Sequence, residues 1–100
     1  MKLTNEFNPI RNWATKKGIY EKGDIKTQYV KLQEEAGELA KAIINKDNDE
    51  IIDAIGDCVV VLTSIAYFNN CKIENCINEA YNVIKERQGK MINGTFKKNN

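Results

Sequence analysis

The sequence predicts an all-α protein, and three observations support this prediction. Apolar residues recur at three- and four-residue spacing over long stretches, no segment shows the strict alternation typical of strands, and the only proline lies near the start. The chain has 100 residues, enough for one small domain over residues 1–100 with a modest core. We therefore expect an antiparallel bundle of about four helices that is completed by oligomerisation.

The first part of the chain predicts a short helix followed by a long one. Pro9 fits the first turn of a helix through Trp13 to Lys17. The segment GIYEKG, residues 18–23, is expected to be a loop because it begins and ends with glycine. Asp24 fits the N-cap of the long helix, which should end near Asn45.

Two further helices are expected in the second half. The polar turn KDND, residues 46–49, leads into a helix that ends at about Phe68. A last helix is expected over about residues 72–88, with isoleucines at helical spacing. Residues 89–100 are expected to form an irregular basic tail that either covers a bound ligand or packs on a partner subunit.

Composition excludes several classes of function. The chain contains no histidine, and its three cysteines form no C-x-x-C pair, so zinc sites and Ser–His or Cys–His nucleophiles are not expected. A net charge of +1 does not indicate a nucleic-acid partner. No run of about 18 apolar residues and no leader sequence are evident, so we expect a cytoplasmic protein with reduced cysteines and no membrane partner.

Acidic residues concentrate in the segment from Lys31 to Asp57, KLQEEAGELAKAIINKDNDEIIDAIGD, which holds eight of the 14 acids. At about 100° per residue, Glu34, Glu35 and Glu38 are neighbours on one side of the long helix. Glu35 falls at the edge of the apolar stripe that contains Leu32. A carboxylate at a core boundary is costly unless a positive group pairs with it.

A second row of acids follows on the next helix. Glu50, Asp53 and Asp57 fall on one face, and beyond Asp57 the same face continues into apolar residues of the segment CVVVLTSIAYF, which is expected to be buried. Both rows could be ordinary solvated faces. Two rows of like charge on neighbouring helices would, however, raise one another's pKa, and a divalent cation would remove that conflict. Oxygen ligands without histidine favour Mg²⁺, with Mn²⁺ as an alternative.

The motif KLxEExxELA, followed after a short turn by DAIGDxxVVL, resembles the MazG-like nucleoside triphosphate pyrophosphohydrolases, particularly their short single-domain members, some of them phage-encoded. The resemblance implies an all-α dimer or tetramer that uses Mg²⁺ to hydrolyse an NTP or dNTP to the monophosphate and pyrophosphate. The EExxE motif matches in full. The ExxD motif departs, because Ala54 stands where its glutamate is expected and Asp53 is the proposed substitute; alternatively, Glu50 and Asp53 form a shifted ExxD.

The resemblance also implies roles for individual residues. The expected metal ligands are Glu35, Glu38, Asp53 and Asp57, and the expected catalytic carboxylates are Glu34 and Glu38. The expected substrate-binding residues are Trp13, Lys31, Asn82, Lys85, Arg87 and Lys90.

Some of these roles have open alternatives. The basic residues after position 82 could equally form a solvated helix end. Trp13, Tyr67 and Phe68 could stack on a base or belong to the core. Two rival functions are a non-catalytic helical interaction module and a related hydrolase acting on a phosphoribosyl-ATP-like substrate.

Overall fold

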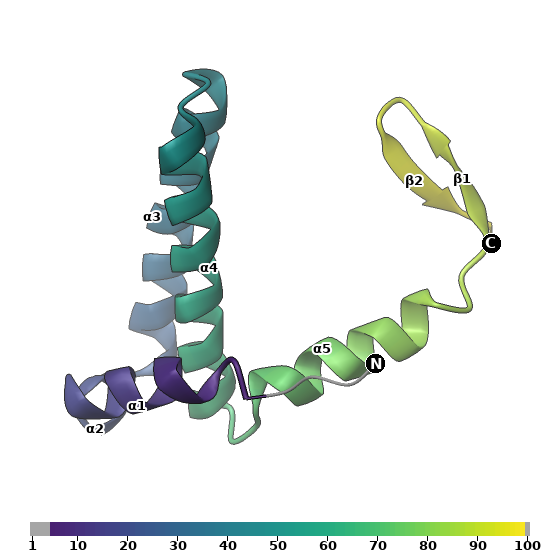
Figure 1. Ribbon diagram of the computed structural model, residues 1–100. Coiled ribbons are helices and arrows are strands. Elements are labelled where there is room, and N and C mark those ends of the chain that lie inside the picture. The colour runs from purple at the N-terminus through teal and green to yellow at the C-terminus, as the bar shows by residue number, and fades with distance from the viewer. Residues whose placement is uncertain (1–4, 100) are drawn as a thin grey trace.

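The computed structural model describes residues 5–99 and is mostly helical, as the sequence predicts (Figure 1). Asn100, which belongs to the expected tail, lies outside the described residues. The elements are α1 (Asn8–Lys16), α2 (Ile19–Lys22), α3 (Ile25–Ile44), α4 (Asn48–Phe68), α5 (Ile73–Ile84), β1 (Gly89–Ile92) and β2 (Thr95–Lys98).

The centre of the fold is the antiparallel pair α3 and α4, which lie side by side over most of their length (Figure 1). Both helices begin at the predicted type of cap. Asp24 accepts a hydrogen bond from the backbone N–H of Thr27 at 2.8 Å, and Asp47 accepts one from the N–H of Glu50 at 3.2 Å. The sequence prediction of two long helices joined by a tight polar turn is confirmed.

Helices α1 and α2 pack across the C-terminal end of α4. The expected loop over residues 18–23 was wrong, because α2 forms a single turn there. This turn closes through bonds from the N–H of Lys22 to the carbonyl of Gly18 and from the N–H of Gly23 to that of Ile19. Gly18 has a φ of 79°, a left-handed conformation that glycine adopts readily.

An aromatic cluster holds α2 against the end of α4. The Tyr20 and Tyr67 rings stack with centroids 3.7 Å apart, and Phe68 meets both rings edge-on at 6.1 and 5.6 Å. Tyr67 and Phe68 therefore contribute to packing in this chain, although Tyr67 remains 45% exposed and neither residue is fully buried.

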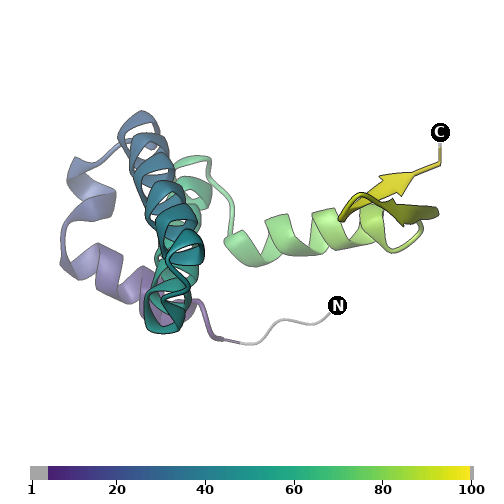
Figure 2. The ribbon, with the colours of Figure 1, turned by 90° about the horizontal axis from the view of Figure 1, so that it is seen from above.

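Helix α5 leaves the α3/α4 pair at a steep angle and, together with the strands, forms an arm (Figure 2). Its first turn is tied to α1 by the Arg11 guanidinium, whose two terminal nitrogens each donate to a Glu74 carboxylate oxygen at 2.7 Å. The helix ends at Ile84, so the predicted end near Gln88 was wrong. Residues 85–88 turn instead toward β1, and the Gln88 carbonyl accepts the N–H of Asn99 at 2.7 Å.

The expected irregular tail was also wrong, because β1 and β2 form an antiparallel hairpin. Asn93 and Gly94 make the turn with positive φ values of 52° and 83°, as a two-residue type I′ connection requires. Among residues 5–99, neither strand comes within 8 Å of a helix, Cα to Cα. The hairpin therefore has no packing partner within the described chain.

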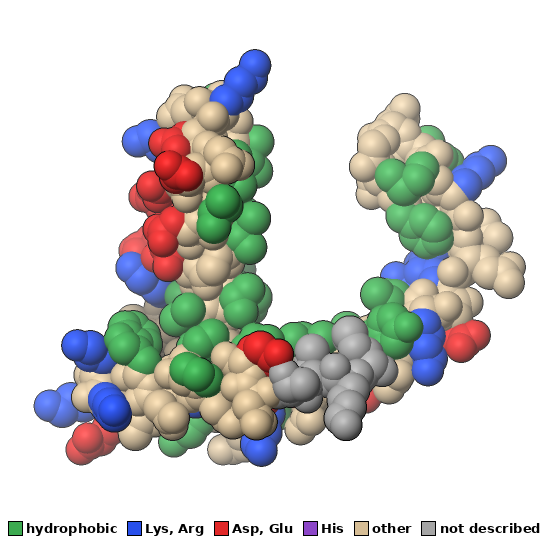
Figure 3. All heavy atoms as spheres, viewed as in Figure 1, with side chains coloured by type: hydrophobic (Ala, Val, Ile, Leu, Met, Phe, Trp, Pro, Cys, Tyr) green, Lys and Arg blue, Asp and Glu red, His purple; other side chains and the backbone are tan. Residues whose placement is uncertain are grey.

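The apolar segments are less buried than the sequence predicts. The buried residues are mostly small and lie between the helices: Ala14, Ala42, Ala54, Val61, Thr63, Ser64, Ala66 and Ile73. Ile43 on α3 and Ile55 and Leu62 on α4 remain 55%, 51% and 39% exposed. The apolar residues of α3 and α4 were expected to be buried, and within one chain this expectation was wrong. No further helix covers the side of α4 that faces the arm (Figure 3).

By length and composition, α4 is also apolar enough to cross a membrane, as the core helix of a bundle can be. It carries Asp57 near its middle and pairs with α3 along its length. A carboxylate at the centre of a bilayer is costly, so these features favour packing against protein.

Candidate active site

The α3/α4 interface brings carboxylates of the two acid rows together. Asp57 interacts with both Asp53 on its own helix and Glu35 on α3. Partial burial, followed by the charges of Asp53 and Glu35, raises the pKa of Asp57 above its ordinary value. The face that carries Asp57 continues into Val61 and Ser64, which are buried, so the acid row does run into the core.

Lys31 provides the local counter-charge. Its Nζ lies 3.3 Å from Glu35 and 3.7 Å from Glu34, and the bond to Glu35 is the main cause of its raised pKa. The Glu35 side chain is only 14% exposed, whereas that of Lys31 is 52% exposed. Because Lys31 is already half-exposed, it can exchange the Glu35 carboxylate for an incoming anion without moving out of a buried position.

Glu38 lies apart from this group. It lines a separate depression of about 260 Å³ together with Glu50, Lys41 and Asp47 at the turn between the helices. The structure thus divides the acids into Glu35, Asp53 and Asp57 on one side and Glu38 with Glu50 on the other. Asp57 interacts with Asp53, whereas Glu50 lines the other depression, which favours the pair Asp53 and Asp57 over the shifted pair Glu50 and Asp53 for the second motif.

A cavity of about 290 Å³ adjoins the first group. Its polar lining includes Glu35, Asp57 and Lys31, together with Thr27 and Gln28 from the first turns of α3. The other lining residues are Trp13, Ile19, Val60, Val61 and Ser64. Thr27 and Gln28 were not among the predicted site residues, because polar side chains one turn after an N-cap look like ordinary surface.

Trp13 stands between this cavity and a neighbouring one of about 340 Å³ that also reaches Asp57 and Val60. Its side chain is 47% exposed. A large, half-exposed aromatic ring beside carboxylates and a lysine is suited to contact a flat, polar ligand.

Four predicted substrate-binding residues lie elsewhere. Asn82 is on α5, Lys85 and Arg87 follow it, and Lys90 is on β1. In one chain this arm points away from the acid rows (Figures 1 and 2). The Lys85 ammonium lies 6.0 Å from the centre of the Tyr81 ring on its own helix.

The residues offer a donor set suited to a hard cation, since all the clustered ligands are carboxylate oxygens. Among residues 5–99, the side chains include no group of three or more Asp, Glu or Cys residues that is already arranged to hold a metal ion. Binding a metal ion would require these side chains to rotate. They have room to do so, because Asp53 is exposed and Asp57 is only partly buried.

Ala54 explains part of the departure from the ExxD pattern. Only 1% of this residue is exposed, and it lies on α4 three residues before Asp57. A buried methyl group at this position contributes to close packing and offers no ligand.

Fold and site together define a mostly helical protein whose paired helices α3 and α4 carry facing carboxylates. Residues 24–92 match the model of the MazG nucleotide pyrophosphohydrolase domain, so the chain belongs to that family. The family is named for nucleotide pyrophosphohydrolase activity, and its members generally use a divalent metal.

A curated relative comes from a phage. The chain is 38% identical over 61 residues to an uncharacterized 18.2 kDa protein in the rep-hol intergenic region of Haemophilus phage HP1 (strain HP1c1). The match covers 61% of this chain and 37% of the relative. No solved structure matches the chain significantly.

Proposed function

We propose that this protein is a Mg²⁺-dependent pyrophosphohydrolase that converts an NTP or dNTP and water to the monophosphate and pyrophosphate. The main structural support is the convergence of Glu35, Asp53 and Asp57 beside a cavity that also contains Lys31 and Trp13. The raised pKa of Asp57 indicates that these carboxylates are held together at an energetic cost, which a bound cation would offset. We take residues 1–100 as one such domain, acting in nucleotide-pool control.

In this proposal, Glu35, Asp53 and Asp57 would hold the metal. The Glu38 side chain would join them by rotating out of the depression that it lines at the turn between α3 and α4. Mg²⁺, when bound, neutralises phosphate charge and makes a water molecule more acidic. Mn²⁺ satisfies the same oxygen donors.

The chain's own residues supply the remaining steps. An exposed carboxylate oxygen of Glu34 or Glu38 accepts a proton from the attacking water. Lys31 Nζ exchanges its contact with Glu35 for a phosphate oxygen, since the lysine is half-exposed and lines the cavity. The Trp13 ring contacts the base.

We further propose that the working form is a homodimer or homotetramer. Ile52 and Ile55 on α4 are 62% and 51% exposed on the face opposite its acids, and Ile84 on α5 is 53% exposed. Figure 3 shows apolar side chains on both sides of the concave space between the α3/α4 pair and the arm. A second copy would cover them and could place Lys85, Arg87 and Lys90 near the acids of its partner.

We place the reaction in the cytoplasm, where its nucleotide substrates occur and where free cysteines such as Cys58 stay reduced. Neither a membrane nor a nucleic acid is needed for it.

The test is a panel of NTPs and dNTPs incubated with the full chain and Mg²⁺, with monophosphate and pyrophosphate quantified separately. We expect both products in equal amounts and neither after chelation with EDTA. Orthophosphate as the first product would contradict the proposed cleavage. Turnover of a phosphoribosyl-ATP-like compound alone would favour the related hydrolase, and no turnover with any nucleotide would favour a helical interaction module.

A further inference from the structure

Cys71, in the turn between α4 and α5, and Cys76, in the first turn of α5, have thiols in contact. The Sγ atoms of Cys71 and Cys76 lie 3.5 Å apart, and both cysteines are free. They are outside the acid rows, at the point where the arm leaves the rest of the fold (Figure 2). A disulfide has an S–S distance of about 2.05 Å, so a small rotation of the two side chains would bring these atoms within bonding range.

The surrounding backbone holds Cys71 in place. Its N–H donates to the carbonyl of Ala66 at 3.0 Å, and its thiol approaches the same carbonyl at 3.4 Å. Asn70, just before it, has a φ of 59° and forms the tight bend that reverses the chain after α4. Cys71 is therefore fixed to the last turns of α4.

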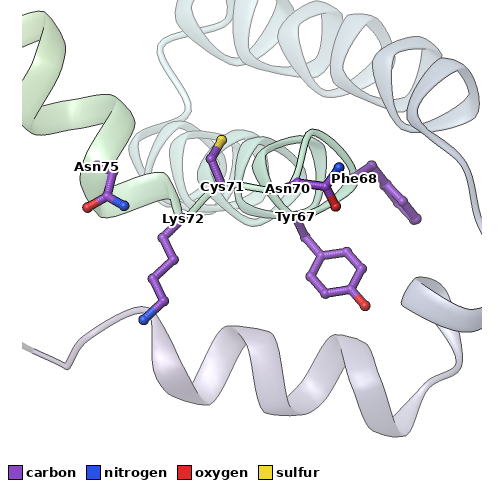
Figure 4. Close-up of a pocket in the computed structure, with 6 residues that line it drawn as sticks. All are labelled: Tyr67, Phe68, Asn70, Cys71, Lys72 and Asn75. Carbon is purple, nitrogen blue, oxygen red and sulfur yellow. The ribbon is translucent and has the colours of Figure 1, made fainter.

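Cys76 is the more accessible of the two thiols. It is exposed, whereas Cys71 is partly buried. Cys71 also lines an open depression of about 670 Å³ at the turn, where Figure 4 shows its side chain pointing away from those of Lys72 and Tyr67. Because Cys76 is the more exposed of the two thiols, a small reagent would meet it first.

We propose that Cys71 and Cys76 form a reversible intramolecular disulfide, with a low-molecular-weight disulfide such as glutathione disulfide as the oxidant. The Cys76 thiolate attacks one sulfur of glutathione disulfide, forms a mixed disulfide and releases one glutathione. The Cys71 thiolate then attacks the Cys76 sulfur, forms the internal bond and releases the second glutathione. Two protein thiols lose two electrons, which reduce one glutathione disulfide to two glutathiones, and the two thiol protons pass to the released thiolates.

The bond would join the first turn of α5 to the end of α4 and thereby fix the direction of the arm. Reduction of the disulfide would leave the turn held by its hydrogen bonds, by the Arg11–Glu74 pair and by the packing of the buried Ile73. The inference rests on sulfur geometry and does not depend on nucleotide hydrolysis. The hydrogen bond with the neighbouring Cys71 thiol, followed by partial burial, raises the pKa of Cys76, so the exchange should accelerate with rising pH.

The test uses the full chain equilibrated in buffers of fixed glutathione to glutathione disulfide ratio, then quenched with acid and analysed by intact mass and non-reducing peptide mapping. We expect a species that has lost two hydrogen atoms and links the peptides of Cys71 and Cys76. The Cys71→Ser and Cys76→Ser variants should instead retain glutathione on the remaining cysteine, at about tenfold higher occupancy than the wild type. Cys58→Ser is the matched control and should behave as the wild type.

Three results would overturn the inference: equal glutathione adducts in the wild type and the single variants, a bond between two chains, or thiols that stay reduced at every ratio. Circular dichroism of each variant distinguishes lost chemistry from lost fold. If a serine variant unfolds, alkylation of the wild type provides the same answer, because oxidation must protect Cys71 and Cys76 together while Cys58 remains reactive.

Discussion

At the scale of single residues, Asp57 is the most informative position. Its carboxyl lies with those of Asp53 and Glu35, and burial together with these charges raises its pKa. Such a group makes its stabilising contribution at low pH and loses it as the pH rises through the folded-state pKa. At neutral pH it therefore costs stability, which is typical of a residue retained for function.

We expect Asp57→Asn to stabilise the metal-free chain, because the amide removes one charge from the cluster. An increase on the order of 1 kcal/mol would raise Tm by about 4–8 °C for a chain of this size. Thermal unfolding in EDTA measures it. A lower Tm for the variant would show that the carboxylates do not repel one another.

The Arg11–Glu74 pair provides a second prediction at this scale. The hydrogen bonds from Arg11 lower the pKa of Glu74 to about 2. Because a depressed pKa stabilises the fold above the unfolded-state pKa, this contribution is present at neutral pH and is lost between about pH 5 and 2.

Glu74→Gln should cost about 1–2 kcal/mol at pH 7, since both side chains are largely buried at 19% and 17% exposure. Urea unfolding of variant and wild type at several pH values should show the difference shrinking below about pH 5. A difference independent of pH would contradict the assignment.

At the scale of elements, the sequence predicted the α3/α4 pair because its signals are local. Asp24 and the KDND turn mark the helix ends, and helical periodicity places the acids. The hairpin also had a local signal, Asn93-Gly94 between Met91-Ile92 and Thr95-Phe96, which the prediction of an irregular tail overlooked. The early end of α5 had no such signal, because it follows from where the chain must enter β1.

Two glycines test the packing of these elements. At Gly23 an added Cβ would lie 2.5 Å from the Ile19 carbonyl oxygen, whereas at Gly37 on the exposed face of α3 it would meet nothing within 4 Å. Gly23→Ala should destabilise the fold by about 1–3 kcal/mol, and Gly37→Ala should stabilise it by about 0.5–1 kcal/mol through helix propensity. Chemical denaturation measures the free energy of unfolding of both variants. Equal changes in the two variants would contradict this account.

At the scale of the whole molecule, the core is small and the arm projects away from it. Much apolar surface is therefore left without a partner within a single chain. Sequence could predict that the acids of α3 and α4 face each other, because helix geometry determines it. It could not predict how the basic residues of the arm reach a substrate, since in the proposed assembly that depends on a second chain. Their role at the site stays a prediction.

Sedimentation should therefore show dimers or tetramers. Ile55→Asp should shift the chain toward monomer, because Ile55 is 51% exposed on the side of α4 opposite its acids. Ile55→Val is the matched control and should keep the oligomer. A monomeric wild type at micromolar concentration would contradict the proposed assembly.

The most direct test of the central claim is Mg²⁺-dependent pyrophosphate release by the wild type, Asp57→Asn and Glu79→Gln in one assay, with the preferred nucleotide. Glu79 is an exposed acid on α5 and serves as the charge-matched control. We predict a loss of about 100-fold or more in kcat/KM for Asp57→Asn and wild-type activity for Glu79→Gln. Equal activity of all three proteins would contradict the claim that the carboxylates between α3 and α4 form the active site.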